Sequence, residues 1–129
     1  MKKMISLLLL AVFVSCSADD DKQEDLQLNG EWFLIEAACY CGFDDEIDLK
    51  DFKLRFDETG DIVHFDNPTD SYFYIAESGT YGYELDENVI LIEGAEPYTF
   101  EIKGSHLILT RIDDPRIADD ELVLTYQRK

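Results

Sequence analysis

The chain has 129 residues and a formal net charge of −18, with 29 Asp and Glu against 11 Lys and Arg. Contacts with nucleic acid need Lys and Arg to neutralise phosphates, so this composition excludes nucleic acid as an expected partner and disfavours flat binding to anionic lipid. The length suits a single domain.

The first 15 residues are typical of a secretory signal peptide. Lys2 and Lys3 precede an apolar stretch, residues 5–14, which is far shorter than the roughly 20 residues of a membrane-spanning helix. Residues 13–16 (FVSC) resemble the lipobox of bacterial lipoproteins, with Phe in place of the usual Leu. The resemblance implies cleavage before Cys16 and acylation of this cysteine, so we expect attachment to a membrane through an N-terminal lipid.

Residues 16–25 (CSADDDKQED) are predicted to form a disordered acidic tether between the lipid and the domain. The acidic run also resembles the export signal of lipoproteins that some Gram-negative bacteria carry to the outer face of the outer membrane. Display at the cell surface is the expected location, with a periplasm-facing lipoprotein as the alternative. Residues 1–15 contain two lysines and no acidic residue, so their removal would leave a net charge of about −20.

Residues 26–129 alternate apolar and polar side chains with the two-residue period of β-strands, and turn-forming residues separate the runs. In the run at 98–103, for example, Tyr98, Phe100 and Ile102 share one face. Gly60 is expected to allow a tight hairpin turn at 57–61, because glycine readily adopts a positive φ. The expected strands are residues 30–38, 52–56, 62–65, 72–77, 80–85, 89–93, 98–103, 106–112 and 122–128, with one helical turn or a loop at 43–51.

About eight or nine short strands joined in order by tight turns predict an all-β fold, an antiparallel up-and-down β-barrel. Closure into a barrel removes the exposed strand edges that would otherwise promote aggregation.

Two cysteines lie in the predicted domain, Cys39 and Cys41, in a compartment that permits disulfides. Residues i and i+2 of a strand are at the far limit of disulfide geometry, and a bridge would need a turn at Tyr40. A Cys39–Cys41 disulfide and two buried thiols therefore both remain open.

The sequence Asn29-Gly30-Glu31-Trp32 resembles the Gly-x-Trp at the start of lipocalins and related small barrels. In that family the tryptophan closes one end of the barrel under a basic residue from the last strand. Arg128 shares the apolar face of the last predicted strand, so the resemblance implies that its guanidinium covers the indole of Trp32. The resemblance extends over residues 26–129 and is closer to the small lipocalin-like domains of bacterial lipoproteins, which are mostly uncharacterised. It therefore implies a shape more than an activity.

Tyrosines are the best candidates for a binding site, since they combine a large apolar ring with a polar tip. They could line a cavity, or they could simply fill the core of a small barrel. The candidates are Tyr72, Tyr74, Tyr81, Tyr83 and Tyr98.

No catalytic residues, metal ligands or cofactor are predicted. His64 and His106 lie in predicted strands, away from any serine at a glycine-rich turn, and are expected to be ordinary strand residues. The favoured hypothesis is a non-catalytic, lipid-anchored binding module for a small apolar or sugar-like ligand. The alternative is a protein–protein interaction module, or an accessory subunit of a cell-envelope assembly, with a barrel filled by side chains.

Overall fold

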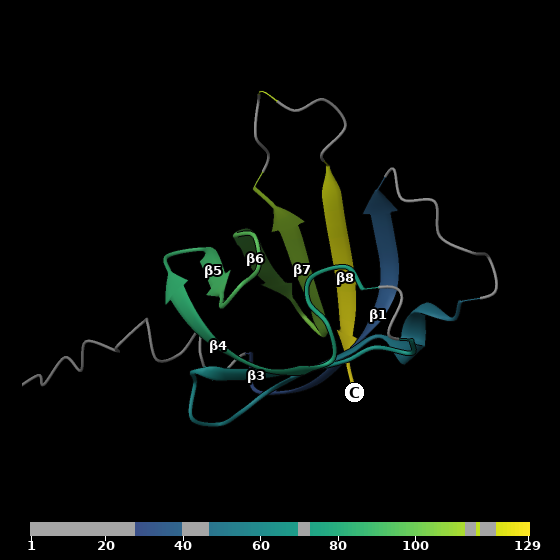
Figure 1. Cartoon of the computed structure of the whole chain (residues 1–129), viewed down its shortest axis with the longest axis horizontal. Helices are drawn as coiled ribbons and strands as arrows, with labels where there is room; N and C mark the ends of the chain where they lie inside the picture. The colour runs from purple at the N-terminus through teal and green to yellow at the C-terminus, as the bar shows by residue number, and fades with distance from the viewer. Residues whose placement is uncertain (1–27, 40–46, 70–72, 113–115, 117–120) are drawn as a thin grey trace, which may run out of the picture.

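The computed structural model describes residues 28–39, 47–69, 73–112, 116 and 121–129. These residues form a closed barrel of eight antiparallel strands in which each strand pairs with its neighbours in sequence (Figure 1). The all-β, up-and-down, lipocalin-like barrel expected from the sequence is thereby confirmed. The strands are β1 (Gly30–Cys39), β2 (Lys53–Phe56), β3 (Ile62–Asp66), β4 (Gly79–Asp86), β5 (Val89–Ile92), β6 (Tyr98–Lys103), β7 (His106–Arg111) and β8 (Leu122–Arg128), with a short 3-10 helix at Leu49–Asp51.

The proposed signal peptide, Cys16 and the acidic tether lie outside the described residues. No helix in the described part of the chain is long and apolar enough to cross a membrane.

β1 closes the barrel because it pairs with β2 on one side and with β8 on the other. Trp32 lies opposite Leu54 of β2 and opposite Arg128 of β8. The β1–β8 register shifts between Leu34 and Glu36, and this irregularity changes which residues of β1 face inward. Beyond it, Ala37 and Cys39 pack against the core.

The interior is filled by the large apolar side chains that the two-residue alternation predicted. In β8, Leu122, Leu124 and Tyr126 are buried, while the residues between them are only partly buried. The same pattern holds in β6 and β7, so each strand contributes alternate residues to one continuous core. The buried residues are Leu28, Trp32, Leu34, Phe52, Leu54, Phe56, Val63, Phe65, Ala76, Tyr83, Ile90, Ile92, Tyr98, Phe100, Leu107, Leu109, Leu122, Leu124 and Tyr126.

The turn between β2 and β3 has the expected form. Gly60 has a φ of 80°, and the amide of Asp57 donates to the carbonyl of Ile62 at 3.0 Å. A residue with a Cβ would be strained at that φ, which explains the glycine.

The strand expected at 72–77 is wrong. Residue 72 lies outside the described residues, and residues 73–78 form no strand. They form a segment that passes in front of β8 in Figure 1. Ala76 is buried, and Tyr74 and Ile75 pack against the core. The apolar side chains of this segment cover the interior instead of joining the sheet, and Asn67 holds it by donating from Nδ2 to the carbonyl of Ala76 at 2.9 Å.

Candidate binding site

One candidate region is the contact between the first and last strands at Trp32. The indole is fully buried, and its Nε1 donates to the carbonyl of Leu28 at 2.8 Å. The Arg128 guanidinium carbon lies 4.2 Å from the centre of the Trp32 ring, within the range of a cation–π contact. Arg128 also donates to the carbonyl of Asn29. This is the arrangement that the lipocalin resemblance implied.

Gly30 explains why the pattern is Gly-x-Trp. Its φ is 112°, a conformation that residues with a Cβ rarely adopt, and a Cβ built there would lie 3.4 Å from Nη1 of Arg128. Glycine therefore turns the chain and leaves room for the guanidinium. The buried Leu28, two residues earlier, packs as part of the core. The indole N–H of Trp32 and the guanidinium of Arg128 both bind partners within the protein, so we assign Gly30, Trp32 and Arg128 a structural role.

Two of the tyrosines predicted to bind a ligand lie in the core and the wall of the barrel. Tyr83 is buried edge-to-face against Phe56, with 5.2 Å between the ring centres. Tyr81 packs in the same way on Phe65 at 5.5 Å, and its hydroxyl donates to the carbonyl of Glu77 at 3.0 Å. Both rings contribute to packing.

Tyr74 and Tyr98 are brought together with a residue that the sequence analysis did not select, Tyr126. Burial raises the pKa of Tyr126 far above its usual value, and the nearby Tyr98 and Tyr74 raise it further. Burial also raises the pKa of Tyr74, whose ring contacts Phe52 at 5.0 Å. Three phenols from β6, β8 and the 73–78 segment therefore gather in the interior. Tyr72, the fifth candidate, lies outside the described residues.

Arg111 also lies near this cluster and was missed in the sequence. It pairs in register with Tyr98 and follows the inward-facing Leu107 and Leu109 at the two-residue period. Its Nε is buried. The available signal was a cation at an inward position of a strand, the same signal that singled out Arg128. A partly buried guanidinium beside phenol groups can donate hydrogen bonds to an acceptor.

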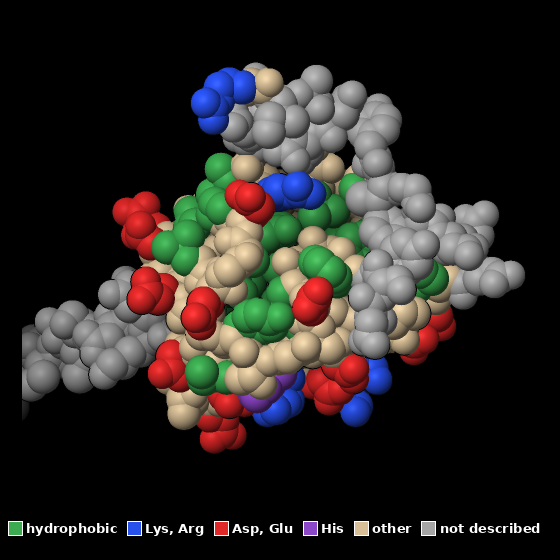
Figure 2. Space-filling view, in the orientation of Figure 1, with side chains coloured by type: hydrophobic (Ala, Val, Ile, Leu, Met, Phe, Trp, Pro, Cys, Tyr) green, Lys and Arg blue, Asp and Glu red, His purple; other side chains and the backbone are tan. Residues whose placement is uncertain are grey.

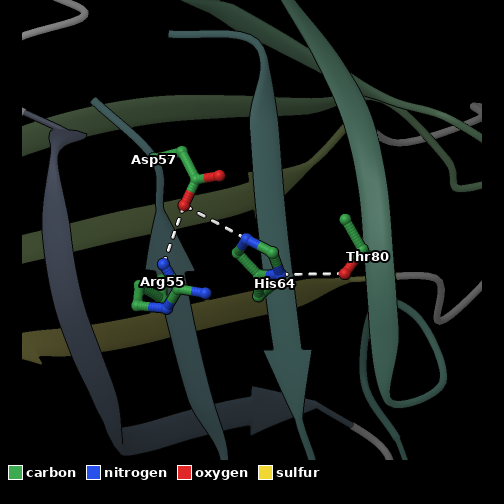
Figure 3. A network of polar contacts seen from close by, with 4 residues as sticks. All are labelled: Arg55, Asp57, His64 and Thr80. Atoms are coloured by element: carbon green, nitrogen blue, oxygen red, sulfur yellow. Dashed lines mark hydrogen bonds and ion pairs between the residues drawn. The ribbon is translucent and has the colours of Figure 1, made fainter. Parts of the chain in front are cut away.

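A polar network lies on the outer wall, across β2, β3 and β4 (Figure 3). Nδ1 of His64 lies 2.8 Å from Oγ1 of Thr80, and Nε2 lies 3.1 Å from Oδ1 of Asp57. The same Asp57 oxygen accepts a hydrogen bond from Arg55 at 2.7 Å. The network connects residues far apart in sequence because His64 and Thr80 are register partners.

The order of groups in this network, carboxylate, imidazole and hydroxyl, is that of a nucleophile activated by a base. Here the imidazole and the carboxylate are each nearly one-third exposed, and Asp57 is shared with Arg55. The strands around this imidazole and carboxylate, β2, β3 and β4, use their backbone amides in pairing with one another. The arrangement therefore fits a set of structural contacts that hold β2, β3 and β4 together on the outside of the barrel better than it fits a reaction centre.

Metal ligands do not gather in the described part of the chain, where no three His, Cys, Asp or Glu side chains converge. Cys39 is disulfide-bonded, so its sulfur is not a free thiolate. The alternative of two buried thiols is therefore wrong for Cys39. The partner of Cys39 lies outside the described residues, so the Cys39–Cys41 pairing stays open. His106 begins β7 opposite Lys103 and Gln127.

No protein-family model matches this sequence, and no curated protein matches it significantly. The chain is therefore characterised by its architecture, an eight-stranded antiparallel barrel with a filled interior and an Arg128–Trp32 contact between its first and last strands.

Proposed function

We propose that this protein is a non-catalytic, lipid-anchored module of the cell envelope that binds a partner protein with the outside of its barrel. The observation that carries this proposal is the filled interior. In the described part of the chain, nineteen buried apolar residues form this core, and they include Trp32, Phe56 and Phe100. A barrel of this size has room inside only for side chains or for one small ligand, and large side chains leave the outer wall as the recognition surface.

The second candidate function, binding of a small apolar or sugar-like ligand, is favoured by a specific observation. Tyr74, Tyr98 and Tyr126 bring three hydroxyl groups together, with Arg111 beside Tyr98. Phenol groups and a cation are the polar contacts that would orient a ligand in an otherwise apolar site.

Titration with an apolar fluorescent probe such as 1-aminoanthracene separates the two candidates. The interaction module is expected to show no saturable binding, because its core is closed by its own side chains. Saturable binding at one site per chain that is lost in Tyr98→Phe and Arg111→Lys would overturn it in favour of the ligand-binding alternative. Urea unfolding of the same variants shows whether they are folded.

The lipid anchor needs a test of its own. Cys16→Ala is expected to abolish acylation and to move the protein from the membrane to the soluble fraction, because the acyl chains provide its membrane affinity. A variant that stays with membranes after a high-salt wash would contradict the anchor.

The acidic tether is tested separately, by replacing Asp19, Asp20 and Asp21 with Ala. This variant should keep the lipid, but protease added to intact cells should reach less of the protein at the cell surface.

A further inference from the structure

The outer wall carries a groove across β3, β4 and β5, centred on Gly82. Its volume is about 550 Å³. Gly82 lies opposite Ile62 in β3, and its carbonyl accepts a hydrogen bond from the amide of Glu93 at 3.0 Å. The groove exists because Gly82 has no side chain between neighbours that have long ones. Its lining consists of Asp61, Ile62, Gly82, Tyr83, Glu84, Leu91, Ile92 and Glu93.

The groove combines an apolar surface with an acidic rim. Leu91, opposite Glu84, is 43% exposed and is one of three large apolar side chains exposed to this degree in the described chain. The carboxylates of Asp61, Glu84 and Glu93 make no ion pair with any described Lys or Arg, whereas Arg55, Lys103 and Lys129 all pair with acids elsewhere. In Figure 2 the surface over β4 and β5 shows Asp and Glu and no Lys or Arg.

Strand addition cannot occupy this groove, because its backbone groups are already paired. The amide of Tyr83 donates to the carbonyl of Asp61, and β4 continues into the pairing with β5. A partner must therefore be recognised through side chains.

We propose that the Gly82 groove docks a lysine or arginine side chain from an extended segment of a partner protein. The aliphatic stem of that side chain would pack over Gly82 between Ile62 and Leu91, and its charged head would meet Glu84, Glu93 and Asp61. The charge is complementary, and the net charge of −18 also attracts a basic segment from a distance. This inference rests on the proposed function and names the partner chemistry for it.

Two variants change the groove without changing the fold. Gly82 does not have a positive φ, and a Cβ placed there meets only ordinary contacts, 3.5 Å from Oε2 of Glu93 and 3.9 Å from the carbonyl of Asp61. Gly82→Val therefore fills the groove without backbone strain. The double variant Glu84→Gln with Glu93→Gln keeps the shape and removes two charges. Its matched control is Glu77→Gln with Glu121→Gln, which removes two exposed charges outside the groove.

The experiment is an NMR titration of residues 16–129 carrying Cys16→Ser, with a short extended peptide of alternating valine and lysine. The same peptide with Nε-acetylated lysines keeps the stems and removes the charges. We expect amide shifts centred on Gly82 and Leu91 with the lysine peptide and none with the acetylated one. Gly82→Val should abolish them, the Glu84/Glu93 variant should bind about tenfold more weakly, as for one lost charge-assisted contact, and the control should bind like the parent.

Binding that survives Gly82→Val, or that weakens equally in the control variant, would show a diffuse attraction to an acidic surface and would overturn the groove proposal. So would the absence of shifts at Gly82. Neither result affects the proposed function, which fails separately if the barrel interior binds the apolar probe.

Discussion

At the scale of single residues, the contact of Arg128 with Trp32 links the last strand, β8, to the first strand, β1. We expect Trp32→Ala to cost about 3–5 kcal/mol of unfolding free energy, as for other large buried side chains. Arg128→Ala should cost less, about 1–2 kcal/mol, because the ring keeps most of its burial.

A double-mutant cycle in urea with the milder Trp32→Phe and Arg128→Lys isolates the coupling between the two side chains, expected at about 1 kcal/mol. Arg55→Lys, on the exposed outer wall, serves as the control and should change stability by less than about 0.5 kcal/mol. Additive single changes would show that the guanidinium contributes nothing through the indole.

The buried phenol of Tyr126 makes stability depend on pH in the alkaline range. Its pKa is raised by burial, by Tyr98 and by Tyr74, so the folded protein keeps the proton that the unfolded chain loses near pH 10. The stabilisation is therefore complete below pH 10 and declines above it, by up to about 1.4 kcal/mol per pH unit. Unfolding free energies at pH 9 to 11.5 should fall less steeply for Tyr126→Phe than for the parent. Equal slopes would mean that Tyr126 ionises in the folded state.

At the scale of elements, the 73–78 segment takes part in the core without belonging to the sheet. The Nδ2 of Asn67 donates to the carbonyl of Ala76, and Oγ of Ser78 accepts from the amide of Asn67. Asn67→Ala should cost about 1 kcal/mol and should speed amide exchange in residues 73–78 before the rest of the chain. Asn88→Ala is the matched control, because its carbonyl, which accepts from the amide of Phe100, is retained. Unchanged exchange in residues 73–78 would show that packing alone holds the segment.

This segment also marks where sequence reasoning fails. Alternation correctly assigned β6 and β8 and their inward faces, because a strand with one buried face repeats every two residues. Residues 73–76 are a run of apolar side chains without alternation, and Tyr74, Ile75 and Ala76 pack on the core of a sheet that other strands build. The apolar pattern of a segment indicates which side chains are buried. It does not show whether the backbone forms hydrogen bonds with a neighbouring strand.

The candidate sites were less predictable than the strands. Trp32 and Arg128 could be paired only because a family resemblance supplied the contact. The approach of Tyr98 to Tyr126, and of His64 to Thr80, depends on register between strands and on barrel closure. A two-residue period predicts which face of the sheet a residue lies on. It does not predict which residue of the neighbouring strand lies opposite.

At the scale of the whole molecule, acidic residues greatly outnumber basic ones. Of the described cations, Arg55, Lys103 and Lys129 pair with carboxylates and Arg128 contacts Trp32. Repulsion among the acids should oppose the compact state. The melting temperature of residues 16–129 should therefore rise between 10 mM and 500 mM NaCl, as the Debye length falls from about 30 Å to below 8 Å. A melting temperature that is constant or falls with salt would show that the acids are arranged with little mutual repulsion.

The β1–β8 pairing also sets the order in which the chain can fold. Arg128 donates to a carbonyl 99 residues earlier, and the amide of Lys129 donates to the carbonyl of Glu31, so the barrel cannot close until β8 is available to pair with β1. Loop-closure scaling puts the entropic cost of joining segments so far apart at about 4 kcal/mol. The hairpins between neighbouring strands can form early, but the edge of β1 stays exposed until β8 pairs with it. During synthesis on the ribosome the sheet would thus stay open until the seven residues of β8 have emerged, and only then could it close into a barrel.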